Sequence, residues 1–167
     1  MTTLLRILRL YPLALWVGGE VFFVVVAAVA FGVLPDAHMA GMVVRGALID
    51  LHWIGIYGGV IYLLATLALM TAQRGMRVVR VIETVLAVVM LMLTLYSQRS
   101  VIPRMEKDRL AVGGDVNAAP KDNPARVEFD RLHSVSVDLE GAVLIAGLVL
   151  LALAPIQTNG VEHRTRD

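Results

Sequence analysis

The stretch LYPLALWVGGEVFFVVVAAVAFGVL, residues 10–34, decides the class of fold. Glu20 is its only formal charge. A helix needs about 20 predominantly apolar residues to cross a bilayer, and this run is long enough to do so. It is followed by Pro35 and Asp36, and a proline at this point ends a helix. The stretch therefore predicts a membrane-spanning helix.

The rest of the chain has the same character. Of its 167 residues, 57% are hydrophobic and only 17% are charged, whereas a soluble domain has about 25% charged residues. The mean hydropathy is +0.72, and the apolar residues form four long runs. The sequence therefore predicts an all-α, integral membrane four-helix bundle that is a single domain over 1–167. We expect the spans at about 10–34, 49–72, 81–102 and 132–154, with an exposed loop at 104–131 and Pro103 ending the third helix.

Several classes of function are disfavoured by the composition. Four spans leave too little chain for a separate catalytic domain, and the absence of cysteine removes disulfides and thiolate sites. The net charge of +1 argues against a nucleic-acid partner. The chain also has no nucleophile elbow and no His-Glu-x-x-His pattern. We therefore expect a non-enzymatic protein whose main partner is the lipid bilayer.

The arginines of the short loops predict the orientation. Arg74, Arg77 and Arg80 lie between the second and third predicted spans, whereas Arg45 is the only basic residue between the first and second. Cytoplasmic loops carry the excess of Lys and Arg. We therefore expect a multi-pass protein of a bacterial inner (plasma) membrane with both termini in the cytoplasm.

Histidines and carboxylates gather at one end of the predicted bundle. The second and fourth spans begin on the same side of the membrane, which places His52 and His133 at similar depth. Residues seven apart share a helix face, so Glu140 lies on the stripe of His133. The candidate cofactor-binding residues are His52, Gly55, Gly59, Tyr62, His133, Ser136 and Glu140, and His52 and His133 are also the candidate metal ligands.

Two interpretations of these residues stay open. Gly55 and Gly59 leave a bare surface beside His52, which is the room that a flat tetrapyrrole ligated by an imidazole would need. The same two glycines also form the small-xxx-small pair that lets membrane helices approach closely. The two histidines are ligands of a shared tetrapyrrole or metal ion, neutral side chains hydrogen-bonded to carboxylates or backbone, or a protonation switch.

Glu20 is the strongest single candidate for a functional residue. It lies near the middle of the first predicted span, where an unpaired carboxylate is costly and usually faces a cavity or a partner. We expect either a protonated, hydrogen-bonded side chain inside the bundle or a role in proton relay or ion coupling. Arg99 or a tyrosine is the expected partner.

Short motifs follow one another in a fixed order along the chain. They are Leu15-Trp16-Val17-Gly18-Gly19 with Phe22 and Phe23, Leu34-Pro35 with Ala40-Gly41, Tyr96 with Pro103-Arg104, and Phe129, Leu132-His133 and Ser136. In this order they resemble the transmembrane-protein-205-like family, a group of small four-helix membrane proteins of largely unassigned function. The resemblance covers most of the chain. It departs at Glu140, where the family commonly has asparagine, and at Asp138, where an apolar residue is usual.

The resemblance implies the four-helix membrane fold and adds a hint about ligands. A eukaryotic relative is linked to drug and metal tolerance. The Trp-Val-Gly-Gly opening at residues 16–19 is also similar to copper-resistance membrane proteins and their haem-binding cousins. These links favour a metal ion or a tetrapyrrole as ligand and do not identify one.

Two functions follow as predictions. The leading one is a small protein that binds a cofactor, pigment or metal (haem, a chlorophyll or bacteriochlorophyll, a carotenoid or a metal ion), or an accessory subunit of a larger redox or pigment complex. Its partner would be another membrane protein or a second copy of the chain. The alternative is a proton- or ion-coupled transporter or efflux protein, with Glu20 as the proton carrier. In that case Arg99, His52, His133 and Glu140 would form the outer gate.

Overall fold

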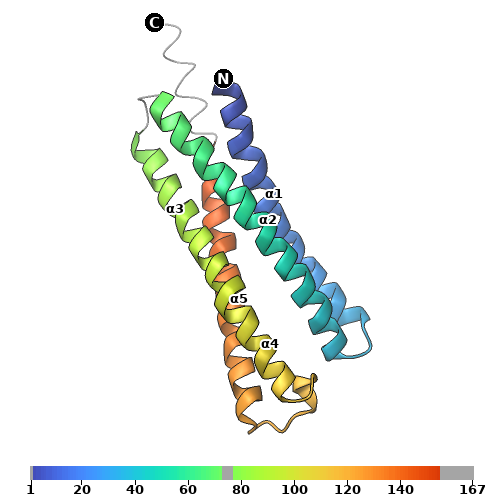
Figure 1. The fold of residues 1–167 in the computed structure, drawn as a ribbon. Coiled ribbons are helices and arrows are strands. Elements are labelled where there is room, and N and C mark those ends of the chain that lie inside the picture. The colour runs from blue at the N-terminus through green and yellow to red at the C-terminus, as the bar shows by residue number, and fades with distance from the viewer. Residues whose placement is uncertain (1, 73–76, 155–167) are drawn as a thin grey trace, which may run out of the picture.

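The computed structural model describes residues 2–72 and 77–154, and the regular elements in these ranges are all helices (Figure 1). Four helical stretches are long and apolar enough to cross a membrane. They pack together as one bundle. The predicted fold class, an all-α membrane four-helix bundle, is therefore confirmed.

Helices α1 (Thr2–Val33) and α2 (Ala37–Ala72) form the first hairpin. The turn between them is closed by Asp36, whose Oδ1 accepts a hydrogen bond of 2.7 Å from the Met39 backbone N–H. This cap starts α2 at residue 37, well before the predicted start at 49, because the whole segment has helical spacing and no breaker after Pro35. The polar residues of 37–50 therefore lie on a helix and not in a loop.

Helices α3 (Arg77–Tyr96) and α4 (Ile102–Ala111) are joined without a break by η1 (Ser97–Val101), a π-helical turn (Figure 1). Pro103 was expected to end the third helix, and this expectation is wrong. Pro103 lies in the first turn of α4. A proline removes a backbone donor and crowds the carbonyl four residues earlier, and the wider π turn just before it accommodates both effects.

Helix α5 (Pro124–Leu153) begins much earlier than the predicted fourth span. The Asn123 side chain accepts from the Ala125 backbone N–H at 2.9 Å, and Pro124 occupies the first turn, where its missing N–H costs nothing. The expected exposed loop at 104–131 is therefore largely helical. Only residues 112–123 separate α4 from α5, and they contain the short 3₁₀ turn η2 (Val116–Ala118).

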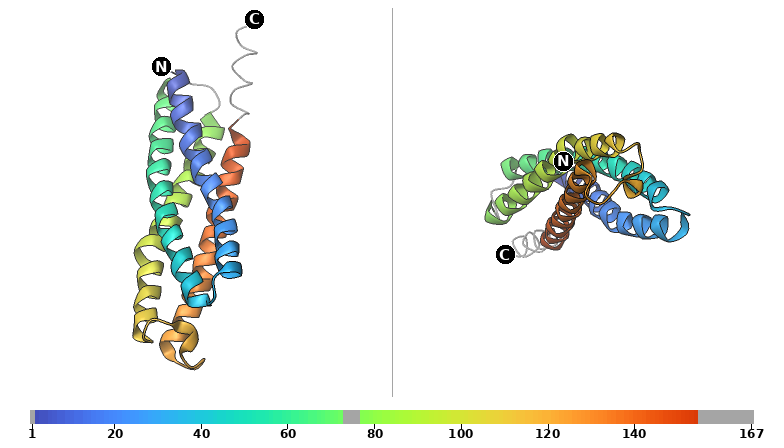
Figure 2. Two further views of the ribbon diagram at one scale, coloured as in Figure 1. Left: turned by 90° about the vertical axis from the view of Figure 1, so that its right-hand side faces the viewer. Right: turned by 90° about the horizontal axis from the view of Figure 1, so that it is seen from below.

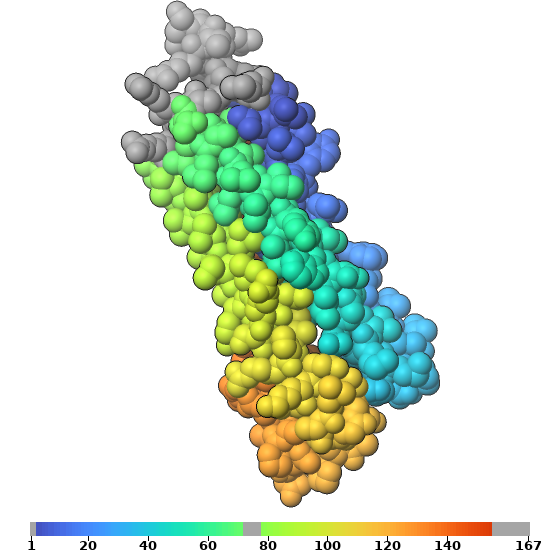
Figure 3. Space-filling view, viewed as in Figure 1, coloured from blue at the N-terminus to red at the C-terminus, as the bar shows by residue number. Residues whose placement is uncertain are grey.

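The helices form a ring in the order α1, α2, α3 and α5 (Figure 2). The N-terminus lies at one end of the bundle, and the turn between α4 and α5 lies at the other (Figure 1). Toward that second end the α1–α2 hairpin diverges from α4 and α5 (Figures 1 and 3). An ion pair of 3.5 Å between Arg45 of α2 and Glu106 of α4 still links the two parts there.

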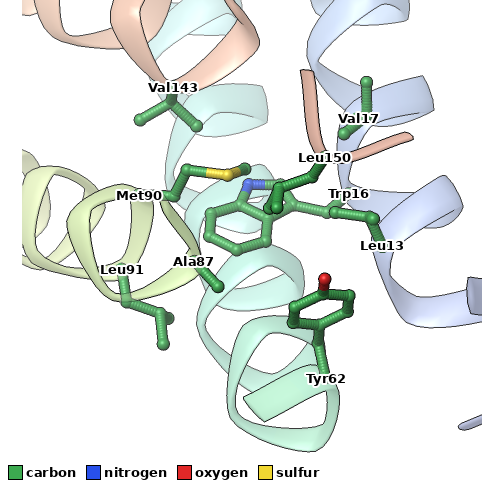
Figure 4. Close-up of a cluster of buried hydrophobic side chains, with 9 residues drawn as sticks. All are labelled: Leu13, Trp16, Val17, Tyr62, Ala87, Met90, Leu91, Val143 and Leu150. Carbon is green, nitrogen blue, oxygen red and sulfur yellow. The ribbon is translucent and has the colours of Figure 1, made fainter. Parts of the chain in front are cut away.

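The main core fills the half of the bundle where the four helices are in closest contact. Trp16 is 1% exposed and Met90 is fully buried. Every long helix contributes to the core, which comprises Leu13, Trp16, Val17, Tyr62, Ala87, Met90, Leu91, Val143 and Leu150 (Figure 4).

Candidate functional site

A buried histidine lies at the centre of a polar cluster inside the bundle. His52 of α2 is fully buried, and both of its ring nitrogens are engaged. Nδ1 lies 2.9 Å from Gln98 Oε1, and Nε2 lies 2.9 Å from Glu140 Oε1. Because an amide oxygen only accepts, Nδ1 carries a proton. The next proton is therefore shared between His52 Nε2 and the Glu140 carboxylate.

The π turn η1 supplies two consecutive side chains to this cluster. Gln98 contacts His52, and Ser97 Oγ donates to Glu140 Oε1 at 3.2 Å. Ser97 is fully buried, whereas Arg99, the next residue but one, is exposed. π turns of this kind are rare and are frequently found at functional sites. Sequence analysis missed Ser97 and Gln98, because neither carries a charge that stands out in an apolar span.

Glu20 of α1 completes the group, which we call the histidine cluster: Glu20, His52, Ser97, Gln98 and Glu140. The Glu20 side chain is 3% exposed, and its Oε1 accepts from Trp16 Nε1 at 3.2 Å. Glu20 also interacts electrostatically with Glu140 and His52. Its hydrogen-bond donor is thus an indole one turn earlier on the same helix, and not the predicted Arg99 or a tyrosine.

The glycines of α2 lie against Trp16. A Cβ atom on Gly55 would lie 2.4 Å from Trp16 Nε1, and one on Gly59 would lie 2.7 Å from both the Trp16 ring and Leu91 Cδ2. Real Cβ atoms do not come so close, so both positions depend on the missing side chain. Close approach of helices accounts for both glycines. A macrocycle against this face would have to displace Trp16.

The structure does not bring His133 to His52. His133 is exposed on α5, where its ring stacks on Phe129 with a centroid distance of 6.5 Å. Glu140, which contacts His52, lies seven residues further on, or about 10 Å along the helix. Ser136 lies between them and is buried. In the part of the chain that the structure describes, no group of three His, Asp or Glu side chains is arranged to hold a metal ion.

A second buried polar group lies toward the other end of the bundle, and we call Arg9, Tyr62 and Glu83 the arginine cluster. Arg9 makes two contacts of 3.3 Å with the Glu83 carboxylate, and its guanidinium lies 5.8 Å from the centre of the Tyr62 ring. All three residues are buried. Tyr62 was predicted on the stripe of His52 but packs here, on the other side of Trp16.

Sequence reasoning missed the pairing in the arginine cluster. Arg9 precedes the first predicted span, and Glu83 lies one turn inside the third, so each is typical of a charge at the membrane interface. The signal that could have found the pairing is topology, because the first and third spans begin at the same end of the bundle. Both residues are buried.

Comparison with known proteins identifies a family. Residues 12–110 match a family model described as "Domain of unknown function (DUF4149)", which is more than half of the chain. No curated protein and no solved structure matches the chain. The matched range contains every member of the histidine cluster except Glu140. The chain is therefore a small multi-pass membrane protein that belongs to the DUF4149 family.

Proposed function

We propose that this protein conducts protons across the membrane through the histidine cluster. The observation that carries the proposal is the buried imidazole of His52 between Gln98 and Glu140, with the Glu20 carboxylate in electrostatic range. Buried ionisable groups inside a membrane bundle are expensive and mark ion pathways and proton relays.

Counting charges in the cluster explains why it would exchange protons. It has two carboxylates and one imidazole, so its net charge is zero when it holds two dissociable protons. With His52 charged, one carboxylate is ionised and the other must be protonated. Removing one proton leaves a buried negative charge, and adding one leaves a positive charge. An uncompensated buried charge is costly, so the cluster returns to its neutral state. A proton that enters is therefore followed by the release of another proton.

Two contacts favour proton transfer over the binding of a cofactor, pigment or metal. Both ring nitrogens of His52 are already hydrogen-bonded. Trp16 occupies the face beside Gly55 and Gly59. Ligation would therefore have to break a polar contact and displace a buried aromatic ring. The role as an accessory subunit, the non-enzymatic character and the resemblance to the transmembrane-protein-205-like family stay predictions.

Proton flux into vesicles tests the proposal. The purified protein is reconstituted into phospholipid vesicles that contain a pH-sensitive dye, and a potassium diffusion potential is applied. We expect acidification of the lumen above the rate of empty vesicles. Glu20→Gln should reduce this flux to the empty-vesicle rate, because an amide cannot carry a proton. Glu128→Gln is the matched control, since Glu128 pairs with Arg104 and Arg131 outside the cluster.

A second measurement does not depend on proton flux. Infrared spectroscopy during a pH titration detects the carbonyl band of protonated carboxylic acids, and we expect Glu20→Gln to remove part of it. Wild-type flux in Glu20→Gln together with an unchanged infrared band would overturn the proposal.

A further inference from the structure

Hydroxyl groups without a partner lie in the interior of the bundle. Tyr62 is 2% exposed and Thr94 is 1% exposed, yet neither the Tyr62 hydroxyl nor Thr94 Oγ1 has a hydrogen-bond partner in residues 2–72 and 77–154. Glu140 Oε2 is also buried and has no hydrogen-bond partner in these residues. A buried polar group left unpaired costs about 1–3 kcal/mol. Buried water normally satisfies such groups.

The Thr94 hydroxyl lies between the two polar clusters along α3. On α3 and η1, the buried face runs from Glu83 through Thr94 to Ser97. Thr94 lies eleven residues after Glu83, which brings it within about 20° of the same helix face and about 16 Å further along the axis. Ser97, which contacts Glu140, is the next buried polar residue on this face.

Tyr62 provides the corresponding position on α2. Its ring lies beneath Arg9, and it interacts electrostatically with Glu83. Its hydroxyl points into the core cluster (Figure 4). One end of this side chain therefore belongs to the arginine cluster, and the other end faces the apolar core that separates the two clusters.

The buried face of α3 that carries Thr94 begins at the arginine cluster, which contains a further buried carboxylate, that of Glu83. Glu83 is fully buried and is held by two contacts with Arg9. Among the described residues, Arg9 of α1 pairs with it and Arg80 of its own helix interacts with it electrostatically, while Arg6 of α1 interacts electrostatically with Arg80. A proton that reaches Glu83 would neutralise it and weaken its pairing with Arg9.

We propose that Tyr62 and Thr94 carry protons between the histidine cluster and Glu83, through water molecules bound to their hydroxyl oxygens. This inference rests on the proposed proton transport. In each step a hydroxyl oxygen accepts one proton and releases the proton that it held, so one O–H bond forms and another breaks. At the end of the line the Glu83 carboxylate becomes a carboxylic acid, while Arg9 keeps its charge.

Substitutions that remove only a hydroxyl test the inference. Tyr62→Phe and Thr94→Val keep the shape of each side chain, and proton flux is measured in vesicles alongside the thermal unfolding midpoint in detergent. We expect flux to fall by roughly tenfold or more in each variant. The unfolding midpoint should stay the same or rise, because an unpaired buried hydroxyl is lost. Tyr57→Phe is the control, since Tyr57 is exposed on α2 and stacks on Trp53.

The outcomes separate this inference from the proposed function. If Glu20→Gln abolishes flux while Tyr62→Phe and Thr94→Val retain the wild-type rate, the inference is wrong and the proposed function stands. A loss of flux that is matched by a lower unfolding midpoint assigns the two hydroxyls to packing and also overturns it. If the wild-type protein carries no flux, both proposals fail together.

Discussion

At the scale of single residues, ionisable side chains in apolar runs indicated members of the site, whereas uncharged polar side chains in such runs were overlooked. Glu20, His52 and Glu140 were predicted as candidate site residues, and they lie together in one cluster. His133 shares a stripe with Glu140 but is exposed, whereas its neighbours Leu132 and Ser136 are buried. Helical phase predicts which residues share a face, but it does not predict where the neighbouring helices cover that face.

Gly55 gives a prediction at this scale. In Gly55→Ala the new methyl group would overlap the Trp16 indole, which is itself buried. We expect a loss of stability of about 1–3 kcal/mol, as is typical of overpacking, measured by thermal unfolding in detergent. Gly41→Ala is the control, because a Cβ there meets nothing within 4 Å and alanine favours a helix. An unchanged unfolding midpoint in Gly55→Ala would contradict the close contact between Gly55 and the Trp16 indole.

At the scale of elements, the four long helices were predictable, but their ends and the π turn were not. Proline predicts a helix end at both Pro35 and Pro103. This prediction is correct for α1, which ends at Val33, and wrong for α3, which continues through η1 into α4. A steady rotation of about 100° per residue also fails across a π turn. For this reason, and because neither side chain is charged, the sequence did not assign Ser97 and Gln98 to the site.

The π turn gives a prediction about deletion. A π turn holds one residue more than an α turn, so removing Ser100 from η1 should leave α3 and α4 in their present phase. We expect a folded protein with native helical content by circular dichroism, but with lower proton flux, because Ser97 and Gln98 would no longer both reach the cluster. Removing Val88 from the middle of α3 should instead prevent folding. Every later residue of the helix would rotate by about 100° about the helix axis, which turns the buried face away from the core. If both deletions behave alike, η1 has no special role.

At the scale of the whole molecule, composition was sufficient for the class of fold, and the number of spans for the end of the bundle at which each long helix begins. An even number of spans returns the chain to the side on which it began. The turn between α4 and α5 lies at the end of the bundle opposite the N-terminus (Figure 1). Which end faces the cytoplasm is still a prediction from the arginine count.

Cysteine labelling tests this orientation, and the chain has no native cysteine to interfere. We expect Asn117→Cys, at an exposed position of η2, to react with a membrane-impermeant maleimide added to intact cells. Thr3→Cys, at an exposed position near the start of α1, should react only after the cells are permeabilised. The reverse pattern would show that the positive-inside rule gives the wrong orientation for this chain.

The buried clusters also bear on the order in which the protein is assembled in the membrane. Glu83 of α3 pairs with Arg9 of α1, and Glu20 of α1 interacts electrostatically with His52 of α2. A single helix released into lipid would therefore carry an uncompensated carboxylate, which is costly. Membrane insertion should accordingly favour helices that enter in pairs. A chain that stalls before α5 would leave His52 without Glu140 and expose this defect to the proteases that remove unassembled membrane proteins.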